Sequence, residues 1–168
     1  VAVDPAVTAK DTSDDTGIIV VGRSKDWNYY VLSDYTYHGD VTGWGQSVVD
    51  AYHRHKADRV VAEKNQGGDL VTVNIRNYDR NIPVTLVTAT RGKALRAEPI
   101  ADLYERGLVH HVGHLIELED ELCMWTPEDD VSPNRLDALV WGVTELMKGS
   151  GDIGTVNNDL ARIIWGNL

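Results

Sequence analysis

Three carboxylates of this 168-residue chain stand where a charge is unexpected. Asp4 follows a short apolar run, Glu63 ends another, and Asp137 lies inside the apolar stretch from Leu136 to Val140. Burying an ionised acid is costly and bringing several together adds repulsion, so such a set is favoured when divalent cations neutralise it. Because the ligands would all be oxygen atoms, the expected cofactors are two Mg²⁺ or Mn²⁺ ions.

The chemistry that fits such a site is hydrolysis of a phosphodiester. Two cations would activate a water, orient the substrate and stabilise the leaving 3′-oxygen, with no need for a protein nucleophile. Each acid alone has an ordinary explanation, since an Asp after a strand is commonly a turn former or cap and a helical acid commonly faces water. The prediction therefore depends on a fold that brings all three acids to one point.

The elements that must position these acids are a set of strands followed by alternating helices and strands. Short connections between strands at 1–3, 16–22 and 28–37 predict an antiparallel meander. Apolar periodicity predicts the remaining elements, with Thr42 as the cap of the first helix and Gly107 as a left-handed residue after the third. The expected helices are 42–56, 69–78, 93–106, 115–125 and 134–148, and the expected further strands are 59–63, 83–88 and 108–112.

This order predicts an α/β protein of the ribonuclease H-like type, in which a mixed sheet joins the meander to parallel strands and helices flank its faces. In such a sheet the first and fourth strands can be central neighbours. Asp4 and Glu63 would then lie at the same edge, and the last helix would bring Asp137 over them. The sequence thus offers one fold that unites the three acids.

Composition limits how this chain could bind nucleic acid. The formal net charge is -10, the wrong sign for global attraction to phosphate, so DNA contact would be local, metal-mediated or helped by another domain. A single cysteine, Cys123, excludes an internal disulfide, and no apolar stretch approaches the roughly 18 residues that span a bilayer. We expect a soluble fragment of a longer protein, with one domain over 1–149 and a tail over 150–168 that is flexible or forms a short contact helix.

Several segments resemble a known family. Val1–Ala6, Val60–Gly68 and Ser132–Gly142 resemble the three nuclease motifs of phage terminase large subunits, and the segments 92–100 and 107–113 resemble that family's helix and following hairpin. The resemblance implies a ribonuclease H-like endonuclease that cuts concatemeric viral double-stranded DNA at the start and end of packaging. It also implies that the three acids are both the catalytic residues and the metal ligands.

The resemblance further implies an N-terminal ATPase domain in the same polypeptide, with the portal and the small terminase subunit as partners in the full motor. It places the protein in the host cytoplasm, away from membranes and absent from the mature virion. The chain has no Gly-rich phosphate loop, so it should not hydrolyse ATP itself. Some relatives have a His one helical turn before the last Asp, where this chain has Asn134; we take Asn134 and Asp15 as candidates for outer contacts to the metal ligands.

The densest basic cluster is a candidate DNA contact. Arg91, Lys93 and Arg96 lie near a helix start, and the last two share one helix face where they could hold a phosphate. Lys64 and Gln66, just beyond Glu63, are weaker candidates. The ordinary alternative for all of them is a solvated surface.

Histidines and tryptophans favour structural roles. His110, His111 and His114 match no closed zinc set, because their stretch lacks further ligands. Three tryptophans lie in helical patterns and are expected in the core rather than as base-stacking platforms, namely Trp44, Trp125 and Trp141.

Three other functions remain open from the residues. A junction resolvase or an RNA–DNA hybrid nuclease would use the same acids on a different nucleic acid. A non-catalytic docking module would keep the acids for structure, and a metal-dependent phosphatase would cleave small phosphate esters. Substrate preference and the effect of removing the acids separate these alternatives.

Overall fold

A six-stranded mixed sheet forms the middle of the protein, in the order β5-β4-β1-β2-β3-β6. The computed structural model describes residues 1–5, 15–40, 42–64, 69–90, 92–129 and 133–148. The strands are β1 (Ala2–Asp4), β2 (Gly17–Arg23), β3 (Tyr29–Asp34), β4 (Val60–Glu63), β5 (Val84–Val87) and β6 (Val109–His111). β1, β2 and β3 pair antiparallel, whereas β4, β5 and β6 join by parallel pairing, which confirms the predicted mixed sheet.

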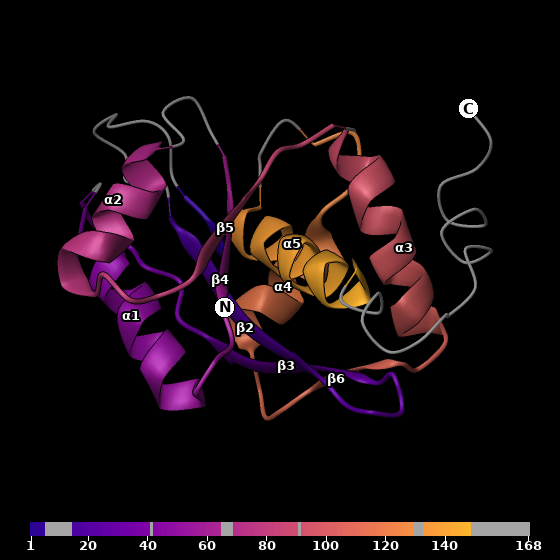
Figure 1. Ribbon diagram of the computed structural model, residues 1–168. Coiled ribbons are helices and arrows are strands. Elements are labelled where there is room, and N and C mark those ends of the chain that lie inside the picture. The colour runs from indigo at the N-terminus through magenta and orange to yellow at the C-terminus, as the bar shows by residue number, and fades with distance from the viewer. Residues whose placement is uncertain (6–14, 41, 65–68, 91, 130–132, 149–168) are drawn as a thin grey trace.

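Helices cover both faces of this sheet (Figure 1). α1 (Trp44–His55) and α2 (Asp69–Tyr78) lie on one face, and α3 (Lys93–Glu105), α4 (Ile116–Met124) and α5 (Asn134–Lys148) lie on the other. Each face has its own hydrophobic cluster, so the protein has three layers with the sheet between two cores. In the described part of the chain, none of the helices combines the length and apolar character needed to cross a membrane.

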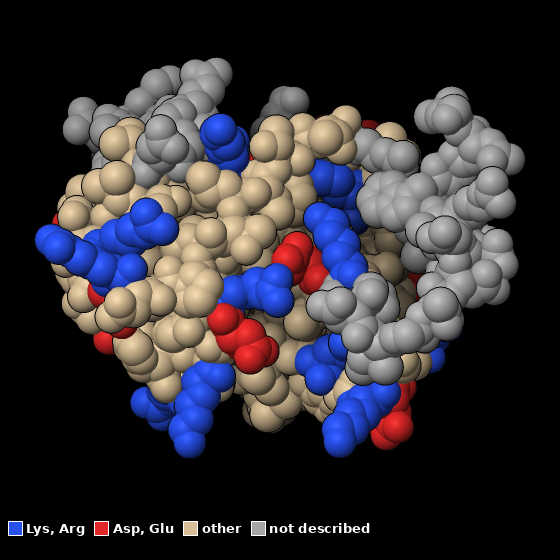
Figure 2. All heavy atoms as spheres, in the orientation of Figure 1, with Lys and Arg blue, Asp and Glu red and all other residues tan. Residues whose placement is uncertain are grey.

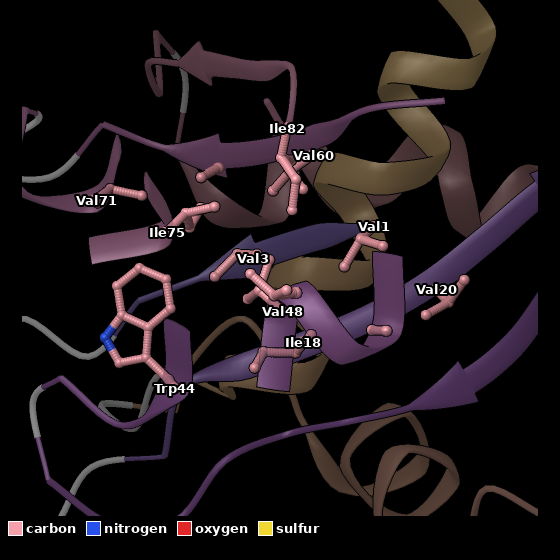
Figure 3. Packing of buried hydrophobic residues seen from close by; sticks show 13 residues of the cluster. Val1, Val3, Ile18, Val20, Trp44, Val48, Val60, Val71, Ile75 and Ile82 are labelled. Carbon is pink, nitrogen blue, oxygen red and sulfur yellow. The ribbon is translucent and has the colours of Figure 1, made fainter. Parts of the chain in front are cut away.

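The core under α1 and α2 follows from strand alternation (Figure 3). Val3, Ile18 and Val20 point from β1 and β2 toward this side, where Val48 of α1 and Ile75 of α2 meet them. Because successive side chains of a strand point to opposite faces, the intervening residues of β1 must face the other layer. That alternation directs Ala2 and Asp4 toward α5.

α5 packs unusually close to the central strands because glycine stands at both contact points. A Cβ on Gly142 would lie 2.7 Å from Val21 Cγ2 and 3.0 Å from the Ala2 Cβ. A Cβ on Gly17 would lie 2.1 Å from the backbone oxygen of Asn134, the first residue of α5. Since Gly17 is the β2 partner of Asp4 in the sheet register, the start of α5 lies directly beside the end of β1.

The cap predicted for the first helix was wrong, and the buried face of α2 does not follow from its apolar spacing. Thr42 does not cap α1, whose N-cap is Gly43; the Asp40 carboxylate instead accepts the backbone N–H groups of Thr42 and Gly43 at 2.9 and 2.6 Å. On α2 the buried apolar residues are Val71 and Ile75, while Leu70 and Val73 are exposed, because α2 turns the other side of its helix toward the core.

The segment from α3 to β6 differs from its apolar spacing and from the family resemblance. Leu95 of α3 is exposed, whereas Ile100 and Leu103 of the same helix are buried. The segment 107–113, which resembles a hairpin in sequence, contributes the single strand β6, paired parallel with β3 at the sheet edge. Gly107 does adopt the predicted left-handed conformation after α3, with φ of 66°. The expected tail over 150–168 lies outside the described residues.

Gly17→Ala is expected to destabilise the protein by about 1–3 kcal/mol, because its methyl group would overlap the backbone at the start of α5. Gly22→Ala is the matched control in the same strand, since its methyl group would meet only Leu32 Cδ1 at an ordinary 3.5 Å. Urea unfolding followed by circular dichroism measures both variants. Equal stability of Gly17→Ala and wild type would contradict the close contact between β2 and α5.

Candidate active site

Asp4 and Glu63 come from adjacent parallel strands and face the same layer. β1 and β4 pair with Ala2 opposite Val61 and Val3 opposite Ala62, so the next residues in both strands, Asp4 and Glu63, lie side by side. Val60 and Ala62 belong to the core under α1, and alternation therefore turns Glu63 toward α5. Both acids thus end their strands at one edge of the sheet and on one face.

α5 brings the third acid to this edge. Asp137 is buried in the first turn of the helix, where Arg96 lies within 4 Å of both Asp137 and Glu63, and its charge raises the pKa of Asp4. Trp141, one turn later on the same side, donates its indole N–H to Glu63 Oε2 at 3.0 Å. The structure therefore brings together Asp4, Glu63 and Asp137, the three acids singled out in the sequence.

Two cations from α3 enter the same cluster. Lys93 Nζ lies 2.5 Å from Asp137 Oδ2, and Arg96 Nη2 lies 3.6 Å from Asp137 Oδ1. Arg96 Nη1 is also 3.9 Å from Glu63 Oε2. The first turn of α3 therefore supplies positive charge to Asp137 and Glu63.

Asp4 is the acid of this cluster whose pKa is raised. Burial and the neighbouring Asp137 and Glu63 carboxylates raise its pKa from 3.8 to about 8, despite the opposing effect of Lys93 and Arg96. Lys93 and Arg96 therefore do not fully compensate the negative charge that Asp4 would carry when ionised. A divalent cation is the kind of ligand that would supply it.

By donor type and charge the three carboxylates fit hard divalent cations, which prefer oxygen ligands. Within the described residues, however, no group of three or more His, Cys, Asp or Glu side chains is spaced to hold a metal ion. Two of the three carboxylates are engaged by Lys93 and Arg96 in this structure, so these ion pairs would have to loosen when a cation binds. The donor chemistry supports a metal centre, whereas the present spacing does not form one.

The other residues predicted to contact DNA are not part of the acid cluster in the described structure. Lys64 is exposed just after β4, and both Arg91 and Gln66 lie outside the described residues. On the face in Figure 2, the described Lys and Arg side chains are separated by acidic or uncharged surface and do not gather into one continuous patch. DNA contact by Lys93 and Arg96 stays a prediction, because the structure shows these residues bound to the acids.

Asp15 lies in a second charged cluster at the start of α5. Arg135 contacts Asp15, Asp34 and Glu121 at 3.3, 2.9 and 3.0 Å, and Asp15 also pairs with His38. Asn134 begins α5 beside Gly17. An outer contact of Asp15 or Asn134 to the metal ligands stays a prediction.

Glu121 has a positioning role that the sequence did not suggest. Its Oε2 accepts the backbone N–H groups of Arg135 and Leu136 at 3.0 and 3.2 Å, groups that have no partner inside the helix. The carboxylate is also favourably placed against the positive end of the helix. Glu121 of α4 therefore anchors the turn of α5 that carries Asp137.

His110 and His111 of β6 make contacts with other elements of the protein. His111 Nε2 lies 2.6 Å from the Tyr104 hydroxyl, and its Nδ1 lies 3.0 Å from Glu119, whose pKa is lowered by this hydrogen bond. His110 stacks against Tyr30 with ring centroids 5.3 Å apart. His111 thus connects α3, β6 and α4, and His110 contacts β3.

Comparisons with known proteins agree with this architecture. A family model described as the terminase RNaseH-like domain matches residues 1–145. The solved structure of T. thermophilus RuvC in complex with a Holliday junction substrate is similar with a TM-score of 0.54 at 16% identity, covering 88% of this chain and 92% of that one. Another Thermus thermophilus RuvC structure has a TM-score of 0.50 at 15% identity, with coverages of 88% and 93%. A search of curated proteins found no match.

Asp4→Asn is expected to stabilise the protein in EDTA, by an amount that grows as pH rises from about 4 to about 8. Between the ordinary pKa of 3.8 and the folded-state pKa of about 8, the folded protein holds a proton that the unfolded chain releases. The stability of the wild type therefore falls with pH in this window, and the neutral Asn removes that loss, by on the order of a few kcal/mol.

Urea unfolding of wild type and Asp4→Asn at several pH values measures the difference. Asp102→Asn, which removes an exposed carboxylate of α3, is the matched control. A gain that does not vary with pH would show that Asp4 is not a strained buried acid.

Proposed function

This chain belongs to the family of terminase RNase H-like domains, and we propose that it is the metal-dependent endonuclease domain that cuts concatemeric viral double-stranded DNA during genome packaging. Membership places it among the nucleases of the ribonuclease H superfamily. The observation that carries the proposal is the meeting of three carboxylates from β1, β4 and α5 at one sheet edge, with the pKa of Asp4 raised to about 8. A structural role for these acids alone would not call for such a concentration of like charge.

The proposed cofactors are two Mg²⁺ or Mn²⁺ ions held by Asp4, Glu63 and Asp137. When bound, they would supply Lewis acidity and a metal-activated water for phosphodiester hydrolysis. The protein's own contribution is to hold the acids on rigid strands and on an anchored helix. Lys93 and Arg96, which neutralise part of the cluster, are placed to contact a phosphate of the substrate once a cation engages the acids.

Long-range attraction of DNA is proposed to come from elsewhere in the motor. The net charge of -10 opposes binding of a polyanion, and the basic residues at the site are few. We therefore propose that the N-terminal ATPase domain of the same polypeptide, with the portal and the small terminase subunit, brings DNA to this edge in the host cytoplasm. Cutting by the isolated chain should then be weak at physiological salt.

A junction resolvase is the second candidate, because the structural neighbours include a RuvC whose structure contains a Holliday junction substrate. At 16% identity that likeness concerns the fold, whereas the family match covers residues 1–145. Comparing a linear duplex with a four-way junction of the same sequence separates the two functions. Preference for the linear duplex would favour the terminase assignment.

Wild-type protein is expected to nick and linearise supercoiled plasmid at low salt with Mn²⁺ or Mg²⁺, and to be inactive in EDTA. Asp4→Asn, Glu63→Gln and Asp137→Asn should each lower the rate by at least about 100-fold, because each removes a proposed metal ligand. Asp102→Asn, an exposed acid of α3, should cut like the wild type. Initial rates on agarose gels measure all five proteins.

Cutting that resists EDTA, or that survives the loss of all three acids, would contradict the proposed mechanism. Melting temperature gives a second measurement, since a cation that binds only the folded protein should raise it. A wild type that neither cuts nor responds to millimolar Mn²⁺ would favour a docking module.

A further inference from the structure

Trp141 lies between two charged groups of the candidate site. Its indole N–H donates to Glu63 Oε2 at 3.0 Å, and the Arg96 guanidinium carbon lies 4.5 Å from the centre of its ring. We propose that Trp141 is a positioning residue that orients Glu63 and Arg96 for cation and phosphate binding. This inference rests on the proposed nuclease function and names a residue on which that function depends.

The hydrogen bond suits the orientation of a metal-binding carboxylate. An indole N–H can only donate, so it fixes Oε2 as an acceptor and leaves Oε1 of Glu63 for another partner. Unlike Lys93 or Arg96, the indole is neutral and leaves the negative charge of Glu63 in place. Trp141 can therefore hold Glu63 without competing with a cation for its charge.

Arg96 depends on the ring for a different reason. Its Nε and Nη1 are buried and make no hydrogen bond, and its nearest carboxylate oxygens are at 3.6 and 3.9 Å, beyond ordinary hydrogen-bond length. The Trp141 ring, with its centre 4.5 Å from the guanidinium carbon, is therefore a contact that orients Arg96. Buried donors without acceptors are costly, and the oxygens of a phosphate would satisfy them.

Trp141 is buried, as the sequence predicts for a core residue, and it also makes polar contacts that core packing does not require. Its side chain is only 6% exposed, yet it belongs to neither hydrophobic cluster, and its polar neighbours are Glu63 and Arg96. It also follows Asp137 by one helical turn on α5. One helix face therefore carries an acid and the side chain that orients the other two groups.

Trp141→Phe tests the proposal because it keeps an aromatic ring and removes the N–H donor. We expect it to lower the maximal rate of plasmid cutting and to raise the Mn²⁺ concentration for half-maximal thermal stabilisation, each by about 10- to 100-fold. Trp125→Phe is the matched control, since the buried Trp125 indole N–H has no hydrogen-bond partner. The control should match the wild type in both measurements.

A double variant shows whether Trp141 acts through Glu63. Trp141→Phe should raise the Mn²⁺ midpoint in the wild-type background and have no further effect in Glu63→Gln, because groups that act together are non-additive. Trp141→Phe with a lower melting temperature but an unchanged Mn²⁺ midpoint would show a purely structural role and overturn the proposal. Equal effects of Trp141→Phe in both backgrounds would overturn it as well.

A measurement on the wild type alone keeps the test independent of how well the variant folds. In an NMR titration with Mg²⁺, the indole N–H resonance of Trp141 should shift with the binding curve while that of Trp125 stays still. A stationary Trp141 resonance in a protein that cuts plasmid would overturn this inference alone. A wild type without cation binding and cutting would overturn the proposed function, and this inference with it.

Discussion

The confinement of three acids at one buried edge of the sheet is the constraint on which the rest of the structure depends. Asp4 and Glu63 cannot separate, because their strands are hydrogen-bonded neighbours at the centre of the sheet. Asp137 cannot withdraw, because α5 is pressed against the same strands and Glu121 fixes its first turn. Hydrophobic packing on both faces of the sheet thus holds three acids together at a cost that appears as the raised pKa of Asp4.

Lys93 and Arg96 compensate only part of the negative charge of the acids, and they do so at two of the three acids. Lys93 and Arg96 contact Asp137 or Glu63, while Asp4 remains with a pKa of about 8. Both cations come from α3, whereas the acids come from β1, β4 and α5, so the compensation and the charge belong to different elements. If a divalent cation binds as proposed, Lys93 and Arg96 could move away from the acids without disturbing the sheet that holds Asp4 and Glu63.

Much of the architecture could be predicted because it follows from local periodicity. Alternation in β1 and β4 and the apolar stripe of α5 are visible in the residues themselves, and together they predict that Asp4, Glu63 and Asp137 meet. The buried face of α2 could not be predicted in this way. Leu70 and Val73 match a helical stripe as well as Val71 and Ile75 do, and only packing against α1 decides between them.

The contacts that orient the site residues, made by Glu121 and Trp141, could not be predicted from the sequence either. The N–H groups of α5 bound by Glu121 belong to residues 14 and 15 positions later, and the Glu63 bound by Trp141 lies 78 positions earlier. No local pattern distinguishes such a Trp from one buried in a core; the spacing of four residues from Asp137 was the one available signal.

The overall charge and the local charge of the domain have different consequences. A net charge of -10 weakens the attraction of DNA over distances comparable to the Debye length, about 8 Å at physiological salt. At the site itself, burial and the neighbouring acids raise the pKa of Asp4, and Lys93 and Arg96 pair with Asp137 and Glu63 rather than with Asp4. Under the proposed function, the domain would contact a phosphate only after a cation has bound and DNA has been delivered, so cutting would depend on whatever delivers the DNA.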